Sequence, residues 1–339
     1  MVLKDSSFIK ACYGKNEDRI PVWIMRQAGR YLPEYREVRK EVSFMELCKT
    51  PELIAKVVKQ PIDRFSLDAA ILFSDILTML EPMGAEISFP EGGPKIAHPI
   101  ATPEDVDRLH PCDVNKLPYV FDGIRHIKKV LPNTPLIGFA GSPFTLACYL
   151  IEGQGSKNFD KAKAFLHRYP DAARKLITLL ADSVSAYLSE QVKAGVDAVQ
   201  LFDSWGGILS REDYRTYSAE PATRIFNSLK NTNVPRIFFV NNLSPYIDIV
   251  RDVPCEVVGV DYRMDLQKAM AELPDKAVQG NLDPSVLFGS PAHVREATQS
   301  LLKTLSNHDR LIFNLGHGIQ PKTPIESVAA MIDAVKQFR

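Results

Sequence analysis

The sequence predicts an α/β protein built as a single-domain (β/α)8 barrel of the TIM type, and three observations support this. Short runs of residues are continuously apolar, which is typical of parallel strands covered on both faces. Longer amphipathic stretches with helix-start signals separate these runs. The chain has 339 residues, a length that such barrels commonly use for one domain, here expected to span residues 1–339.

Eight apolar runs are the predicted strands of the barrel. They are rich in β-branched and aromatic residues and contain few polar interruptions. In order along the chain, they are Val22–Met25, Ala69–Phe73, Pro135–Phe139, Asp197–Phe202, Arg236–Val240, Glu256–Val260, Lys276–Gln279 and Leu311–Asn314.

Helix-start and helix-stop residues lie between these runs. Ser43 precedes a predicted helix over 44–60, and helices are also expected to begin near residues 102, 210 and 323. The longest predicted helix covers 170–194 and ends at Gly195, a residue suited to a C-terminal cap. The segment 81–99 (EPMGAEISFPEGGPKIAHP) predicts an inserted loop with room for a hairpin rather than a domain boundary.

Composition narrows the functional class. The 41 Lys and Arg residues equal the 41 Asp and Glu residues, which argues against a global nucleic-acid or membrane-surface footprint. The five cysteines are scattered without a CxxC motif, which favours a reducing compartment. There is no signal-peptide core or membrane-length apolar run, so we expect a cytoplasmic protein. Any anionic partner would then have to be bound by a local cluster of basic residues.

Polar, small or titratable residues follow the predicted strands. Active sites of such barrels lie at the carboxyl ends of the strands, so these residues are expected to converge. The groups are Arg26 and Arg30, Ser74-Asp75, Gly141-Ser142-Pro143, Asp203-Ser204-Trp205-Gly206-Gly207, Asn241-Asn242, Asp261, Asn281 and Gly316-His317-Gly318.

Each candidate also has a purely structural interpretation. Arg26 and Arg30 resemble ordinary surface charges, yet Arg26 directly continues an apolar run and Ala28-Gly29 leaves room for a ligand. Asp75 suits both a helix cap and a group at the barrel mouth, and Ser204 has the same ambiguity. His317 is either structural or faces a ligand between its two glycines. An aromatic residue such as Tyr149, at helical spacing, is usually part of a core.

Other motifs predict little chemistry. His110-Pro111-Cys112 has the H-x-C form of some zinc sites, but no further Cys lies at metal-binding spacing. Gly153-Gln154-Gly155-Ser156 lacks the full pattern of a phosphate loop and indicates a flexible loop. No metal site is therefore expected.

Five ordered blocks resemble the uroporphyrinogen decarboxylase family. They are PVWIMRQAGRYLPEYR at 21–36, FSDIL at 73–77, GFAGSPFTLACYLIEG at 138–153, LFDSWGG at 201–207 and NLGHGI at 314–319. The resemblance extends from about residue 5 to the C-terminus. One departure is local, since some members carry Glu and His where this chain has Asp203 and Trp205.

The resemblance implies a homodimeric, cofactor-independent carboxy-lyase of haem biosynthesis. Its substrate would be uroporphyrinogen III, whose four acetate side chains lose carbon dioxide to give coproporphyrinogen III. By motif position, the residues at the catalytic centre would be Arg26, Asp75, Tyr149 and His317. Those that contact substrate would include these four and also Gln27, Ala28, Arg30, Arg39, Phe202 and Ser204.

Chemical reasoning fits this implied role. A substrate with eight carboxylates needs a locally cationic pocket, which arginines and His317 would supply. A ring-protonated pyrrole accepts the electrons released by decarboxylation, and Asp75 would stabilise that cation. Three alternatives remain open: a related zinc-dependent barrel methyltransferase, a non-catalytic porphyrin or anion carrier, and a phosphate-binding barrel enzyme using Gly316–Gly318.

Overall fold

The computed structural model describes residues 3–90 and 93–338. Within these residues, seven parallel strands form one sheet in the order β1-β4-β5-β6-β7-β8-β9. Each overlaps a predicted strand, so the α/β prediction is confirmed at these positions. The strands are β1 (Ala70–Ile71), β4 (Leu136–Gly141), β5 (Ala198–Asp203), β6 (Arg236–Val240), β7 (Val257–Val260), β8 (Ala277–Leu282) and β9 (Leu311–Leu315).

The remaining predicted strand, Val22–Met25, which comes first along the chain, is reduced to a single β-bridge. Val22 pairs in parallel with Phe313 of β9, and the Trp23 N–H donates to the Phe313 carbonyl at 3.3 Å. On its other side, the Val22 carbonyl accepts from the Asp68 N–H at 2.9 Å, two residues before β1. The Asp68 side chain in turn accepts from the Val22 N–H at 2.8 Å. The segment thus joins the two edges of the sheet, although a side chain replaces part of the strand ladder.

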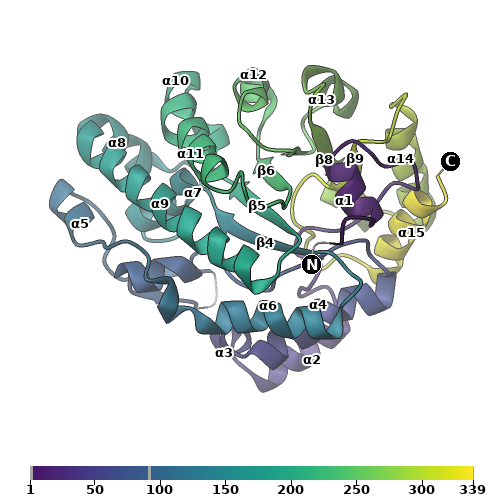
Figure 1. The fold of residues 1–339 in the computed structure, drawn as a ribbon, viewed down its shortest axis with the longest axis horizontal. Coiled ribbons are helices and arrows are strands. Elements are labelled where there is room, and N and C mark those ends of the chain that lie inside the picture. The colour runs from purple at the N-terminus through teal and green to yellow at the C-terminus, as the bar shows by residue number, and fades with distance from the viewer. Residues whose placement is uncertain (1–2, 91–92, 339) are drawn as a thin grey trace.

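Helices cover the outside of this sheet (Figure 1). Their apolar faces pack on the strands, and one continuous hydrophobic core includes residues from the first helix to the last. The α-helices are α1 (Ser7–Cys12), α2 (Pro33–Glu41), α3 (Phe44–Lys49), α4 (Pro51–Phe65), α5 (Pro103–Asp107), α6 (Pro118–Val130), α7 (Pro143–Glu152), α8 (Asp160–Arg168), α9 (Pro170–Ala194), α10 (Arg211–Tyr214), α11 (Glu220–Ser228), α12 (Ile247–Arg251), α13 (Leu266–Glu272), α14 (Pro291–Lys303) and α15 (Ile325–Lys336).

Shorter turns of helix connect these elements. The 3₁₀ segments are η1 (Thr78–Met83), η2 (Val114–Lys116), η3 (Gly206–Ile208), η5 (Ser244–Tyr246) and η6 (Pro284–Phe288), and η4 (Arg215–Ala219) is a π-helical turn between α10 and α11. Within the segment 81–99, β2 (Ile87–Ser88) and β3 (Lys95–Ile96) pair antiparallel, which confirms the hairpin. Residues 91–92 of that segment lie outside the described residues.

Proline and glycine set several helix boundaries. The helix predicted over 44–60 is divided at Thr50 because Pro51 starts a new helix, whereas Ser43 caps α3 as expected by accepting from the Glu46 N–H at 3.1 Å. The helix predicted over 170–194 is α9 itself, and Gly195 follows it with a φ of +115°.

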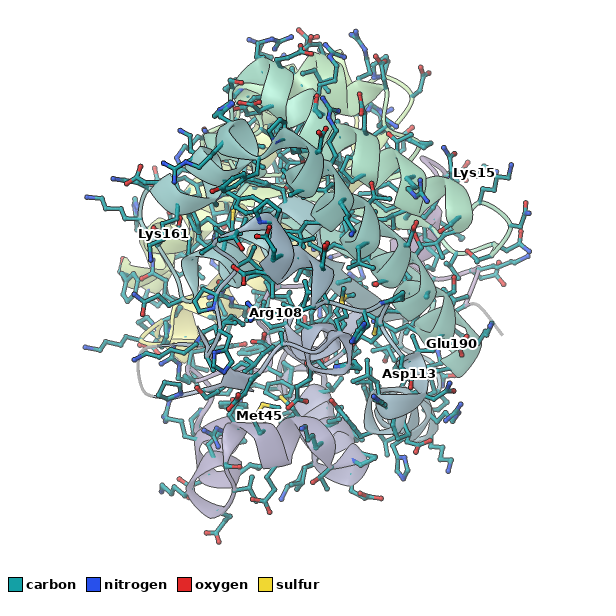
Figure 2. All side chains as sticks on the ribbon, turned by 90° about the vertical axis from the view of Figure 1, so that its left-hand side faces the viewer. Lys15, Met45, Arg108, Asp113, Lys161 and Glu190 are labelled. Carbon is teal, nitrogen blue, oxygen red and sulfur yellow. The ribbon has the colours of Figure 1, made fainter. Side chains whose placement is uncertain are left out.

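Buried polar side chains from three different elements are hydrogen-bonded to one another inside the barrel. The Trp23 indole donates to Gln279 at 2.9 Å, and Gln279 donates to Gln200 at 3.1 Å. All five cysteines are buried free thiols. By contrast, the outer face in Figure 2 carries charged side chains such as Lys161 and Glu190, which come from α8 and α9. None of the helices within the described residues has the length and apolar content needed to cross a membrane.

Candidate active site

Two adjoining cavities open where the strands end. The larger, of about 350 Å³, is lined by Arg26, Asn241, Tyr262, Arg263, Asp283, Pro284, Ser285, His317, Gly318, Ile319, Gln320 and Pro321. The smaller, of about 220 Å³, is lined by Lys157, Phe159, Ser204, Trp205, Gly207, Ile208, Asn241, Asn242 and Arg263. Asn241 and Arg263 line both cavities, which therefore form one cleft at the carboxyl ends of the strands.

Arg26 sits in this cleft because the turn after Met25 is fixed from several sides. Its φ of +66° is unusual for a residue with a side chain. The Gln27 side chain holds the turn by accepting from the Ile24 N–H and donating to the Ala69 carbonyl, both at 3.2 Å. The buried Gln27 side-chain amide is thus occupied by the main chain, and the Gln27 backbone N–H also donates, to the Ile24 carbonyl at 3.0 Å. Both groups are therefore engaged before the contact with substrate that we expected.

The end of β9 completes the seat of Arg26. The Met25 N–H donates to the Asn314 side chain at 3.1 Å, and the Met25 carbonyl accepts from the Ile319 N–H at 3.0 Å. A Cβ on Gly318 would lie 2.6 Å from the Arg26 Cδ, so the arginine side chain runs directly against the Gly318 backbone. Glycine at this position is what permits that close approach.

Asp75 fulfils its capping interpretation and also faces the arginine. Its Oδ1 accepts from the Leu77 N–H at 2.9 Å, just before η1. Burial raises the pKa of the Asp75 carboxyl, while the Leu77 N–H and the Arg26 charge partly counteract that rise. A desolvated carboxylate beside a guanidinium is therefore present at the end of β1.

Tyr149 lies on α7 close to the same pair. Burial raises the pKa of the phenol, the Asp75 carboxylate adds to the rise, and the Arg26 charge opposes it. Tyr149 is therefore a neutral hydrogen-bond donor around pH 7. It also packs on the hydrophobic core, so the core interpretation and the site interpretation both apply to this residue.

His317 lines the larger cavity after β9. Burial lowers the pKa of the imidazole, and the nearby Arg26 charge lowers it further. His317 thus presents a neutral ring to the cleft. The cationic role expected of it requires an arriving carboxylate, because a nearby anion favours the protonated form.

Arg30 and Arg39 lie beside the cleft rather than in the lining of either cavity. Burial raises the pKa of the Tyr35 hydroxyl, and Arg39 and Arg30 both oppose that rise, so the two arginines flank one phenol. Arg39 donates to the Val42 carbonyl and lies 6.0 Å over the Phe44 ring. Arg30 is exposed, and Ala28 is half-buried in the same turn.

An aromatic cluster connects the Arg39 region to the end of β1. Tyr35 and Phe44 pack on Phe73 with ring centroids 5.7 and 6.0 Å apart, and Phe73 lies two residues before Asp75. The pKa of the Cys48 thiol is raised to about 12, mainly by burial, with the Asp75 charge contributing to the rise and the Arg39 charge opposing it. Arg39 and Asp75 therefore lie on the same side of the barrel.

The loop after β5 is fixed by a buried carboxylate. Asp203 accepts from the hydroxyls of Ser142 at 2.7 Å and Ser218 at 2.5 Å, and from the Gly206 N–H at 3.1 Å. Burial raises the pKa of this carboxyl, and the hydroxyl donors lower it. The network places Ser204 on the wall of the smaller cavity.

Phe202 supplies an apolar wall one residue before Asp203. Its ring packs edge-on against Phe139 and Phe239, with centroids 5.6 and 5.8 Å away, and it remains partly exposed. A partly exposed aromatic ring at a strand end is suited to contact with a flat ligand.

A family model described as uroporphyrinogen decarboxylase (URO-D) matches residues 3–338. The chain belongs to the uroporphyrinogen decarboxylase family. The uroporphyrinogen decarboxylase of Pelobacter propionicus is 46% identical over 337 residues, covering 98% of this chain and 99% of the relative. That of Coxiella burnetii strain RSA 493 is 46% identical over 345 residues, covering 99% and 96% of the two chains.

The fold of this chain is similar to that of a solved structure with low sequence identity. A methyltransferase from Methanosarcina mazei superposes with a TM-score of 0.81 at 20% identity, covering 99% of this chain and 98% of the other. This likeness confirms the barrel-type fold. Within residues 3–90 and 93–338, no three His, Cys, Asp or Glu side chains gather as a metal-binding group. In the H-x-C motif at 110–112, the Cys112 N–H donates to the Ser183 hydroxyl of α9 at 3.1 Å.

The sequence reasoning missed Tyr262, Arg263 and Lys157, which line the cleft. Arg263 follows a predicted strand only two residues after Asp261, so the strand-end signal that identified Asp261 also reaches it. Lys157 had no such signal, because it comes from the loop between α7 and α8.

Proposed function

We propose that this chain is a uroporphyrinogen decarboxylase, which removes carbon dioxide from the four acetate side chains of uroporphyrinogen III and releases coproporphyrinogen III. The family model and the curated relatives named uroporphyrinogen decarboxylase support this activity. The observation that carries the mechanism is that the Arg26 charge lies close enough to Asp75 to lower the pKa of its carboxyl, and also acts on Tyr149 and His317.

The cationic residues account for the choice of a carboxylate-rich substrate. Guanidinium groups present paired donors that match a carboxylate, and such charge-assisted hydrogen bonds are the stronger ones. Arg26 would meet the reacting acetate inside the cleft. Arg30 and Arg39, beside the cleft, would meet carboxylates at the edge of the macrocycle.

The Asp75 carboxylate accounts for the reaction. A proton added to a pyrrole carbon makes the ring cationic, and that ring then accepts the electron pair left when the acetate C–C bond breaks. Carbon dioxide departs, and a second proton converts the resulting methylene carbon to a methyl group. The first proton then leaves the ring carbon, which restores the neutral pyrrole, so each lost carbon dioxide consumes one proton in all. Asp75 would accept from the inward pyrrole N–H groups and stabilise the cationic ring. A preorganised charge aimed at developing charge is commonly the largest catalytic contribution.

Tyr149 and His317 would orient the substrate around this centre. The neutral phenol of Tyr149 donates a hydrogen bond, and His317 would bind a carboxylate that restores its proton. Phe202 would pack on the macrocycle. We assign Arg26 to the position nearest the reacting acetate, where it would hold the carboxylate and deliver a proton through water.

The organisation of the whole chain belongs to the same proposal. One core that includes residues from α1 to α15 supports a single catalytic domain over 1–339. We propose that this domain acts as a homodimer in the cytoplasm, in keeping with the family resemblance.

Anaerobic incubation of purified protein with uroporphyrinogen III tests the activity. After oxidation, chromatography should show the intermediates with seven, six and five carboxylates and then coproporphyrin III. Recovery of unchanged uroporphyrin would contradict the proposal, and tight binding without products would identify a porphyrin carrier. Methyl transfer to a thiol, with stoichiometric zinc in the purified protein, would instead indicate the methyltransferase alternative.

A further inference from the structure

Arg263 is a charged residue of the cleft to which the proposed mechanism gives no role. It follows β7 and is part of the wall of both cavities. Half of its side chain, 50%, remains exposed, so the guanidinium is accessible from the cleft. A cation shared by two cavities is well placed to bind an anionic group of a ligand that spans them.

The guanidinium of Arg263 is held in position before any ligand arrives. Its Nη1 donates to the Asp261 Oδ1 at 3.2 Å and to the Asn241 Oδ1 at 3.4 Å, and its plane lies 4.5 Å over the Tyr262 ring. The Tyr262 backbone packs closely on Gly316, where a Cβ would lie 2.2 Å from the Tyr262 nitrogen. The side chain therefore loses little freedom when it binds.

The opposite edge of the guanidinium is available. Nε and Nη2 make no hydrogen bond with any residue that the structure describes, whereas Nη1 is engaged twice. Asp261 is fully buried and also accepts from the main-chain N–H of Leu243 at 2.9 Å and of Arg263 at 3.0 Å. Two parallel N–H donors in a planar fork match one carboxylate.

Arg263 also lies across the barrel from Asp75. In the sheet order β1-β4-β5-β6-β7-β8-β9, with segment 21–25 between β9 and β1, the strand β7 is four positions from β1 in both directions. A macrocycle centred on Asp75 would extend its far edge toward β7. Only a peripheral side chain of the substrate would then reach Arg263.

We propose that Arg263 binds a propionate carboxylate at the far edge of the tetrapyrrole, an inference that rests on the proposed decarboxylase function. Four successive reactions convert the acetates to methyl groups but leave every propionate in place. A fixed anchor that serves all four turnovers must therefore recognise a propionate. Lys157, across the smaller cavity, supplies a second cation near the same edge.

Binding of stable oxidised porphyrins to Arg263→Gln tests this role. Uroporphyrin carries acetates and propionates, whereas coproporphyrin carries only propionates, and fluorescence titration measures the Kd of each. We expect both Kd values to rise by about tenfold. Arg263→Lys should lose less affinity because it keeps the charge. KM for uroporphyrinogen should rise more than kcat falls, since the contact is present in both ground and transition states.

Arg251→Gln is the matched control. Arg251 is 48% exposed at the end of α12, and its ion pairs, with Asp252 at 3.9 Å and Glu272 at 4.0 Å, are long. Its replacement should leave both Kd values unchanged. If Arg263→Gln binds coproporphyrin as tightly as the wild type, or loses affinity only for uroporphyrin, the propionate assignment is wrong. Decarboxylation by the wild-type protein would in that case still support the proposed function. If the wild-type protein itself fails to decarboxylate, the proposed function is wrong instead.

Discussion

Replacing Asp75 with asparagine separates its electrostatic role from its structural one. The carboxamide keeps the oxygen that accepts from the Leu77 N–H, so the turn before η1 should survive. It removes the negative charge that faces the cationic ring. At a separation of about 4 Å and an effective dielectric constant of about 20, that charge is worth roughly 4 kcal/mol. We therefore expect kcat to fall by 10²- to 10³-fold, the residual dipole of the amide preserving part of the effect.

The same substitution has an opposite consequence for stability. Because burial raises the pKa of Asp75 in the folded chain, the folded state binds this proton more tightly than the unfolded state. The free energy of unfolding therefore falls as pH rises through that raised pKa. At pH 7 the ionised carboxylate costs stability, and Asp75→Asn should be at least as stable as the wild type in urea denaturation. Turnover should show the reverse dependence, falling as acid protonates Asp75.

Asp113→Asn provides the control. Its Oδ1 accepts from the Asn115 N–H at 3.2 Å at the start of η2, the same two-residue turn that Asp75 makes. Asp113 is exposed on the face shown in Figure 2 and lines neither cavity. The kcat of the Asp113→Asn variant should equal that of the wild type. A kcat for Asp75→Asn within threefold of wild type would refute Asp75 as the stabiliser of the ring cation.

Three further substitutions test neighbouring parts of the site. Arg30→Ala should weaken inhibition by uroporphyrin by about five- to tenfold, while its unfolding free energy stays within about 0.5 kcal/mol because the residue is exposed; an unchanged inhibition constant would remove Arg30 from the substrate contacts. Gly318→Ala, at a residue without positive φ, should displace the Arg26 side chain and lower kcat/KM by at least tenfold, and a wild-type value would show that Arg26 need not lie against this backbone. Asp203→Ala removes the acceptor for the donors of Ser142, Ser218 and Gly206 in the interior. Urea denaturation should therefore show a free energy of unfolding about 3 kcal/mol lower than that of the wild type. A decrease of less than about 1 kcal/mol would contradict the role of this network.

Continuous apolar runs made most of the barrel predictable. The runs at 197–202 and 236–240 became strands nearly at their predicted bounds because parallel strands buried on both faces tolerate little else. The run at 22–25 was less predictable. Its apolar residues indicated a strand, yet the side chain of Asp68 and the amide of Gln27 bind backbone groups that a neighbouring strand would otherwise pair.

The candidate site was predictable where the chemistry follows a strand directly. Arg26, Ser204 and His317 line the cleft because each comes within two residues of a strand end or of the closing segment. Arg39 and Lys157 lie on a helix and a connecting loop, whose approach to the cleft depends on tertiary packing. The neutral state of His317 could not be predicted from the sequence, since it depends on burial and on Arg26, which is far away in the sequence but close in the folded chain.

The pairing of segment 21–25 with β9 has a consequence for folding during synthesis. Arg26 is translated long before Asn314, Gly318 and Ile319, the residues that hold it in place. A nascent chain that already holds β1 to β8 thus lacks the support for its own key guanidinium. We therefore expect a chain that stops before residue 314 to lack activity, even where much of the sheet can form.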